Sequence, residues 1–301
     1  MSETANQPTD PQAPPKPAAS GAAATSEPTL YGGVRSRRVT VRDLQAAKER
    51  GERWGMLTSY DMLSAQIFDE AGIPVLLVGD SAGNNVLGYE TTVPVQLEEL
   101  LPLTRAVVGA SKRAMVVGDL PFGSYQASPE QAFMSALRLI KEGGAHAVKL
   151  EGGRRVVPQV ELLANSGMAV MGHIGLTPQS VHGIGGFRVQ GRGEDAGEQV
   201  LADALALQQA GAFAVVLELV PATLAERVSR ELTIPTIGIG AGAGCDAQVL
   251  VWTDMAGLNA GPGPRFVKRY ADLRGTLSAA AAEYAEDVRT GRYPSAEHSY
   301  T

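Results

Sequence analysis

The sequence predicts an α/β protein with a (β/α)8 barrel, on the basis of three observations. From about Val39, short apolar runs alternate with longer amphipathic segments, which is typical of strand–helix units and a parallel sheet. About eight such units follow one another along the chain. The 301 residues suffice for one barrel domain of about 250 residues. An open doubly wound sheet is the alternative, because a pattern of elements does not fix topology.

The chain divides into two predicted regions. Residues 1–36 are rich in Pro, Ala, Ser and Thr and lack the basic start and apolar core of a signal peptide, so we expect a disordered tail. Residues 37–301 are expected to form a single catalytic domain that includes a C-terminal helix. The Ala- and Glu-rich segment 279–288 predicts that helix, packed on the barrel or on another subunit.

The predicted strands are short apolar runs that precede Gly, a charged residue or a turn. They span residues 54–59, 75–78, 114–117, 147–150, 169–171, 213–217, 236–239 and 249–251. The segments between them predict helices, several of which end in Gly before a buried strand. The clearest helices span residues 62–71, 97–109, 129–143, 156–166, 198–211 and 221–232.

Three acidic residues stand where predicted strands stop: Asp80, Asp119 and Glu151. They are separated by about one strand–helix unit each, and the ends of successive strands lie side by side on one rim of a closed parallel barrel. We therefore expect the three carboxylates to converge on a patch that suits a hard divalent cation such as Mg²⁺. The alternative for each aspartate is a cap on the following helix.

Two neighbours of these acids are further candidates for the same site. Lys149 lies two residues before Glu151, and the period of two along a strand points both side chains the same way. Ser81 follows Asp80 in a loop of small residues where the backbone can approach a ligand. A structural ion pair is the alternative reading of Lys149.

His173 and Glu218 stand at the ends of the fifth and sixth predicted strands. Histidine titrates near neutral pH, so His173 suits either acid–base chemistry or a neutral hydrogen bond to a ligand oxygen. Leu217 and Leu219 flank Glu218, and partial desolvation between them would make its carboxylate a stronger base. The alternative is that Glu218 caps the helix that begins near Pro221.

Two glycine-rich segments interrupt the regular pattern. The connection 174–194 is too long for a simple turn and carries Arg188 and Arg192, so we expect a lid or ligand-contacting loop, with a flexible solvated connection as the alternative. The run 238–244 resembles a phosphate-binding loop, but it lies late in the chain and lacks the acidic partner of a dinucleotide site. A close-packed loop at the barrel rim is the better interpretation of that run.

The composition indicates a small-molecule partner. The net charge of −6 gives no general electrostatic reason to bind nucleic acid or an anionic membrane. No apolar run approaches the roughly 18 residues that span a bilayer. Cys245 is the single cysteine, so no intrachain disulfide can form, which is consistent with a reducing compartment. We therefore expect a cytoplasmic protein.

Eight short segments carry a specific resemblance: LTSYD (57–61), VGDS (78–81), DLPF (119–122), VKLEGG (148–153), GHIGLTPQS (172–180), GFRVQGR (186–192), GIGAG (238–242) and EHS (297–299). Together they resemble one family, the ketopantoate (3-methyl-2-oxobutanoate) hydroxymethyltransferases. The resemblance runs in order from about Val39 to the C-terminus. Only the N-terminal tail lies outside it.

The resemblance implies a (β/α)8 barrel of the phosphoenolpyruvate/pyruvate type and a Mg²⁺-dependent one-carbon transfer in pantothenate, hence coenzyme A, biosynthesis. The co-substrate 5,10-methylenetetrahydrofolate would give its one-carbon unit to 3-methyl-2-oxobutanoate, forming 2-dehydropantoate and tetrahydrofolate. The family also implies a homo-oligomer, commonly a homodecamer.

The resemblance also implies roles for the site residues. Asp80 and Asp119 match the metal-binding aspartates, with Glu151 completing the metal shell directly or through water. Ser81 and Lys149 match substrate-binding positions, and we expect both aspartates and His173 to contact the 2-oxo acid as well. Glu218 matches the proposed catalytic base.

Two other functions are compatible with parts of this pattern. A Mg²⁺-dependent lyase or mutase acting on a 2-oxo acid would share the acidic strand ends, but such enzymes usually carry a cysteine on a mobile loop over the site. A non-catalytic barrel would not need all the acids, yet Asp80, Asp119, Glu151 and Glu218 are all present.

Overall fold

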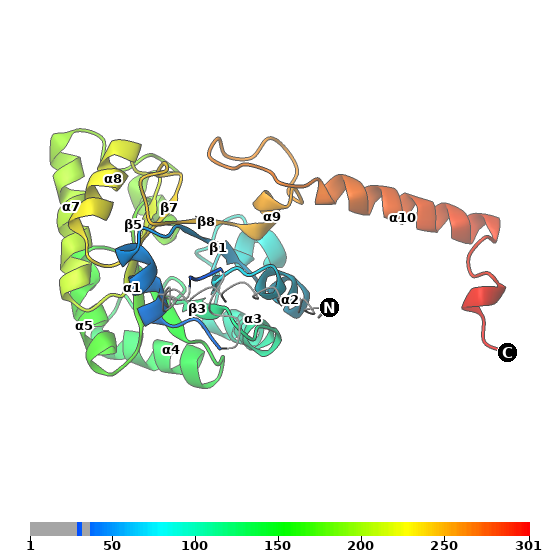
Figure 1. The fold of residues 1–301 in the computed structure, drawn as a ribbon, viewed down its shortest axis with the longest axis horizontal. Coiled ribbons are helices and arrows are strands. Elements are labelled where there is room, and N and C mark those ends of the chain that lie inside the picture. Colours follow the sequence, from blue (N-terminus) through cyan, green and yellow to red (C-terminus); the bar gives the residue numbers. More distant parts are fainter. Residues whose placement is uncertain (1–28, 32–36) are drawn as a thin grey trace, which may run out of the picture.

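In the computed structural model, which describes residues 29–31 and 37–301, eight parallel strands form a closed barrel (Figure 1). The strands are β1 (Trp54–Thr58), β2 (Val75–Val78), β3 (Met115–Asp119), β4 (Ala147–Glu151), β5 (Val170–Gly175), β6 (Ala214–Glu218), β7 (Thr236–Ile239) and β8 (Ala247–Leu250). Each pairs with the next, and β8 pairs with β1, so no strand edge is left open. The predicted fold class is confirmed, and the open sheet is excluded.

Side chains alternate along the strands between the barrel interior and the surrounding helices. Met56, Leu77 and Val117 belong to the cluster that fills the interior, whereas Leu76 and Val116 pack in a cluster with helix residues such as Ala65 and Val107. This arrangement buries both faces of the sheet, which explains why the strands read as continuous apolar runs.

Helices follow most strands and cover the outside of the barrel (Figure 1). The longer ones are α1 (Val41–Glu49), α2 (Met62–Glu70), α3 (Leu97–Ala110), α4 (Pro129–Lys141), α5 (Val157–Asn165), α7 (Glu194–Gln209), α8 (Ala222–Glu231) and α10 (Leu273–Thr290). All six helices predicted between strands are present within a few residues of their expected bounds. The short helices α6 (Val181–Ile184) and α9 (Trp252–Met255) and a π-helical turn, η1 (Gly83–Leu87), lie in the connections.

Two strands differ most from their predicted positions, and the others agree with them to within two residues. The fifth strand continues past residue 171, because its pairing with β6 extends to Gly175 opposite Glu218, so His173 lies inside the strand. The eighth begins at Ala247 and not at residue 249, because Gln248 is exposed and interrupts the apolar run that indicates a strand. It follows β7 without an intervening helix.

The helix α1 was not predicted, and its buried side chains contact the cluster that fills the barrel interior. Leu44 and Ala47 are buried and belong to the interior cluster. The Lys48 ammonium lies 2.7 Å from Asp246 Oδ2 and donates to the carbonyl oxygen of Ser229. These contacts tie α1 to the segments that flank β7.

The C-terminal helix α10 is longer than expected and does not pack on the barrel. None of its residues is buried, and Figure 1 shows it projecting away from the other helices. Leu277, Tyr284 and Val288 are about half exposed or more, and their spacing places them on one helical face.

Most of the predicted tail lies outside the described residues, so its disorder stays a prediction. Thr29–Tyr31 are described: Leu30 is buried in the interior cluster, and the Tyr31 hydroxyl accepts a hydrogen bond from the Gly55 amide at 2.7 Å. Within the described residues, no helix combines the length and apolar character needed to cross a membrane.

We predict that Gly175→Ala destabilises the barrel by about 1 to 3 kcal/mol. Gly175 ends β5 with φ +89°, and a Cβ there would overlap the carbonyl oxygen of Glu218. Thermal unfolding followed by circular dichroism measures the effect. Gly183→Ala is the matched control, because a Cβ at Gly183 meets nothing within 4 Å. Equal melting temperatures for both variants would contradict the prediction.

Candidate active site

The structure brings the predicted site residues to one cavity of about 330 Å³ at the carboxyl-terminal ends of the strands. Its lining includes Asp80, Ser81, Asp119, Lys149, Glu151, His173 and Glu218. The register of the sheet explains the grouping, because Asp119 pairs with Lys149 across β3 and β4, and Glu151 pairs with His173 across β4 and β5.

Close ionic contacts join these side chains. Lys149 Nζ lies 2.9 Å from Asp119 Oδ1, and both side chains are almost fully buried. His173 Nδ1 lies 3.3 Å from Glu151 Oε1, and its Nε2 lies 3.1 Å from Glu218 Oε2. Lys149 Nζ is also 3.4 Å from His173 Nδ1. Two basic groups are thus interleaved with three carboxylates.

Burial and charge shift the ionisation of this cluster. Burial and the positive charge of Lys149 act against protonation of His173, but Glu151 and Glu218 outweigh them and raise its pKa to about 9. Burial likewise opposes the charge on Lys149, but Asp119, Glu151 and Asp80 outweigh it and raise the pKa of the lysine. Both groups are therefore cations at neutral pH.

The carboxylates respond in different directions. Burial and the charges of Asp119 and Glu151 raise the pKa of Asp80 well above its usual range. Burial also raises the pKa of Asp119, although Lys149 opposes it. The pKa of Glu151 is lowered, because the charge of His173 and its hydrogen bond outweigh the effect of burial. The two aspartates are thus short of compensating positive charge.

Gln179 connects the acids, and sequence reasoning gave it no role. Its Nε2 donates to Asp80 Oδ2 at 2.9 Å, and its backbone N–H donates to Glu151 Oε2 at 3.1 Å. Its own carbonyl oxygen accepts from the Tyr125 hydroxyl at 2.7 Å. The signal available was its place in the GHIGLTPQS segment, within the long connection after the fifth strand. Ser81, which was predicted, shares a hydrogen bond of 2.8 Å with the Tyr60 hydroxyl.

The donor set suits a hard cation at Asp80 and Asp119. Asp119 Oδ1 is buried and makes no well-aligned hydrogen bond, although Lys149 lies nearby. Both oxygens of Glu151 face other groups, His173 and the Gln179 amide. Within the described residues, no three His, Cys, Asp or Glu side chains converge as a ready set of ligands. The geometry therefore provides two aspartates for a metal, with the remaining ligands left to substrate or water.

The backbone next to Glu218 is strained. Leu219 has φ +45° and is the only described residue other than glycine in the left-handed region. Hydrogen bonds hold it there, because its N–H donates to the Ile239 carbonyl and its own carbonyl accepts from the Gln190 amide. Strain of this kind persists where the surroundings fix it, often at functional sites. The strained residue directly follows Glu218, whose carboxylate faces His173.

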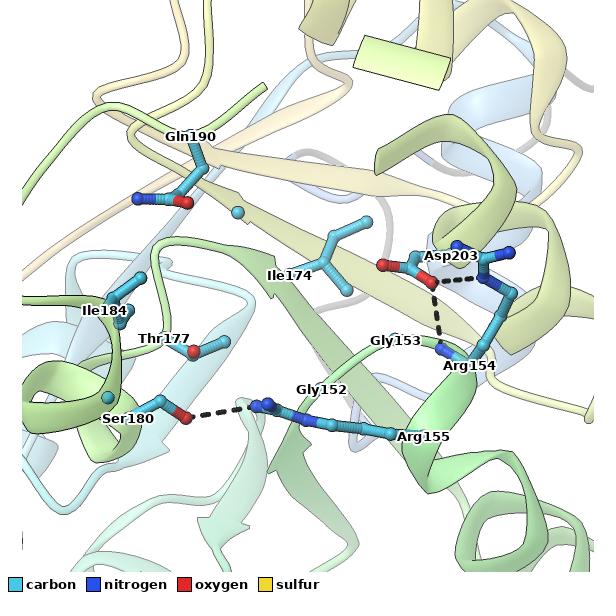
Figure 2. A pocket seen from close by; sticks show the side chains of 12 residues that line it. Gly152, Gly153, Arg154, Arg155, Ile174, Thr177, Ser180, Ile184, Gln190 and Asp203 are labelled. Carbon is cyan, nitrogen blue, oxygen red and sulfur yellow. Dashed lines mark hydrogen bonds and ion pairs between the residues drawn. The ribbon is translucent and has the colours of Figure 1, made fainter. Parts of the chain in front are cut away.

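The long loop after β5 separates two cavities. Pro178 and Phe187 of this loop line the cavity that contains the acids. A larger cavity of about 710 Å³ lies on the other side, and its lining includes Gly152, just after β4, and Ile174 of β5. Figure 2 shows its arginines already paired with protein groups, Arg154 with Asp203 and Arg155 with Ser180. The two arginines expected to contact ligand, at positions 188 and 192, line neither cavity.

Solved structures share the barrel at low sequence identity. Phosphonopyruvate hydrolase in complex with oxalate and Mg²⁺ superposes with a TM-score of 0.55 and 11% identity, over 86% of this chain and 92% of that chain. A 2,3-dimethylmalate lyase of the PEP mutase/isocitrate lyase superfamily gives a TM-score of 0.53 and 16% identity, over 87% and 91%. These likenesses establish the fold.

Curated relatives are far more similar. A 3-methyl-2-oxobutanoate hydroxymethyltransferase of Saccharopolyspora erythraea is 67% identical over 271 residues, which are 90% of this chain and 92% of that protein. One from Frankia casuarinae is 63% identical over 298 residues, which are 99% of this chain and 100% of that protein. The family model described as ketopantoate hydroxymethyltransferase matches residues 38–296. The chain therefore belongs to the ketopantoate hydroxymethyltransferase family.

Proposed function

We propose that this protein transfers a hydroxymethyl group from 5,10-methylenetetrahydrofolate to 3-methyl-2-oxobutanoate, giving 2-dehydropantoate and tetrahydrofolate, in pantothenate biosynthesis. Family membership over most of the chain supports the reaction. The observation that carries its chemistry is the position of Glu218, a carboxylate that faces the buried charged cluster from β6, with Oε2 3.1 Å from His173 Nε2.

The charge in the cavity supports a divalent cation as cofactor. Five carboxylates line the cavity, and Asp254 on α9 is one of them. The other four stand at strand ends with two cationic side chains, Lys149 and His173, among them. Two negative charges remain in this strand-end group. Burial raises the pKa of both Asp80 and Asp119, and the neighbouring carboxylates add to the rise. We therefore assign Mg²⁺ to these two aspartates and an outer role, through water, to Glu151. Bound there, the ion would supply positive charge to the carboxylate and keto oxygens of the 2-oxo acid.

The reaction begins with loss of the proton at C3 of the 2-oxo acid, and we assign its removal to Glu218. His173 positions Glu218 through Nε2, while its other nitrogen is held by Glu151. Lys149 offsets the negative charge that develops on the keto oxygen, and its burial strengthens that interaction. Ser81, with Tyr60 behind it, is placed to hydrogen-bond the substrate carboxylate. The C3 carbanion then bonds to the methylene carbon delivered by the folate, and water supplies the hydroxyl oxygen. Both C–N bonds of that carbon break, and the two nitrogens take up the C3 proton and one proton of the water as tetrahydrofolate leaves.

A lyase or mutase of the same superfamily is disfavoured by the position of the single cysteine. Cys245 is buried between β7 and β8 in the core cluster outside the barrel, and it does not line the cavity that contains the acids. Its burial raises the pKa of the thiol, which disfavours a reactive thiolate. No cysteine of the described chain can therefore serve that cavity.

We also propose a cytoplasmic homo-oligomer, as the family suggests. The apolar face of α10 supports this, because Leu277, Tyr284 and Val288 are solvent-exposed on a helix that makes no buried contact with its own barrel. A second copy of the chain would cover that face. The homodecamer common in the family is the expected assembly.

The direct test is turnover by the purified protein. We expect folate-dependent consumption of 3-methyl-2-oxobutanoate in the presence of Mg²⁺, and loss of that activity on chelation with restoration when Mg²⁺ is added back. Asp80→Ala should abolish the restoration, because it removes one of two aspartates assigned to the ion. A wild-type protein without folate-dependent turnover would refute the proposed reaction.

Glu218→Gln should retain binding of the 2-oxo acid but slow exchange of its C3 proton by about 100-fold or more, as expected for loss of a general base. Proton NMR in D₂O measures the exchange without the folate, and calorimetry measures binding. The amide keeps the shape of the side chain, so packing is preserved. Exchange at the wild-type rate would assign the base elsewhere, with His173 as the next candidate.

Light scattering should give a mass several times the 31.5 kDa of one chain. The double variant Leu277→Asp and Tyr284→Asp should form smaller species, because it places charge on the apolar face of α10. Glu283→Gln on the same exposed helix is the matched control and should not change the mass. A wild-type protein of monomer mass would contradict the oligomer.

A further inference from the structure

The cavity that contains the acids has two chemically different halves. The charged half described above lies on the inner ends of the strands and suits the small 2-oxo acid. The other half is apolar and is lined by Leu219, Val251, Pro264, Phe187 and Phe266. The proposed substrate 3-methyl-2-oxobutanoate is a five-carbon acid. When the charged groups bind it, the apolar half of the cavity remains without a ligand.

Two phenylalanines from different loops contribute to the apolar half. Phe187 belongs to the loop after β5 and is 67% exposed, an unusual position for a large apolar side chain on a cavity wall. Phe266 belongs to the segment after α9 and packs near Leu219, since a Cβ at Gly240 would lie within 3.0 Å of both side chains. Within the described residues neither phenylalanine ring stacks on another aromatic ring.

Two polar groups in the same cavity have unused hydrogen-bonding capacity. Asp254, on α9, accepts at Oδ1 from Asn259 Nδ2 at 2.8 Å, and no donor from the described residues faces its other oxygen. Thr92 is only 7% exposed, and its buried hydroxyl has no hydrogen-bond partner there. A buried polar atom without a partner is costly unless a ligand or water satisfies it.

We propose that this half of the cavity binds the pterin ring of the reduced folate, an inference that rests on the proposed reaction. The ring is flat and apolar on its faces, which suits contact with Phe187 and Phe266. One edge of the ring carries an amino group beside a ring N–H, and a carboxylate can accept from both. Asp254, which lines the cavity, is that carboxylate.

The position of the base agrees with this assignment. Glu218 and Leu219 are consecutive, so the group that takes the C3 proton adjoins the apolar wall. A folate held there would present its methylene carbon, bound next to the pterin, to the carbon that loses the proton. The larger cavity in Figure 2 would not place the methylene carbon near Glu218, because it is lined by residues at the ends of β4 and β5 and Glu218 is not among them.

The test compares two variants with two readouts. We expect Asp254→Asn and Phe187→Ala each to raise the KM for methylenetetrahydrofolate tenfold or more. The KM for the 2-oxo acid and the rate of C3 proton exchange in D₂O, measured without the folate, should stay within twofold of wild type. Phe187→Tyr keeps an aromatic face and should retain a KM close to wild type. Calorimetric titration with tetrahydrofolate checks the loss of binding directly.

Asp203→Asn serves as the matched control, because Asp203 lines the larger cavity instead. An increase in the folate KM in Asp203→Asn but not in Asp254→Asn would move the folate to that cavity and overturn the proposal. Slowed C3 proton exchange in Asp254→Asn would also overturn it, since Asp254 would then act on the 2-oxo acid. A wild type that turns over the folate while both variants behave normally refutes only the pterin site, whereas an inactive wild type refutes the reaction itself.

Discussion

The carboxyl-terminal rim of this barrel depends on one electrostatic balance. Lys149 and His173 are almost fully buried, and they lie among carboxylates from β3, β4 and β6. An uncompensated buried charge costs several kcal/mol, so neither the cations nor the acids would be tolerated alone. The balance is incomplete at Asp80 and Asp119, where burial first, and then the neighbouring carboxylates, raise the pKa of each aspartate although Lys149 opposes the rise. The two aspartates assigned to the metal ion are therefore also the residues at which the buried charges are not balanced.

The sequence alone was sufficient to predict the barrel and most of the site. Parallel strands are buried on both faces, so they appear as apolar runs that are easy to locate, and acids that follow such runs must lie on one rim. On this basis the sequence alone groups Asp80, Asp119 and Glu151. It also placed Lys149 beside Glu151, because residues two apart on a strand point the same way. These inferences use only local periodicity and closure of the sheet.

The remaining features depend on contacts between distant segments. The pairing of Glu151 with His173 is a matter of strand register, which periodicity does not determine. Gln179 lies in an irregular loop, and its contact with Asp80 spans ninety-nine positions of sequence. The exposure of α10 could not be predicted either, because a helical pattern does not reveal whether the apolar face of the helix contacts its own barrel or another chain.

The hydrogen bonds made by Gln179 link ligand binding at this site to the loop after β5. One residue of the loop after β5 donates its amide to Asp80 and its backbone N–H to Glu151. Any ligand that draws either carboxylate towards itself weakens one of these bonds and so changes the free energy of the loop. Occupation of the charged half is therefore linked to the stability of the loop that carries Phe187. The hydrogen bonds of Gln179 therefore contribute, together with the substrates, to the order in which ligands bind at this site.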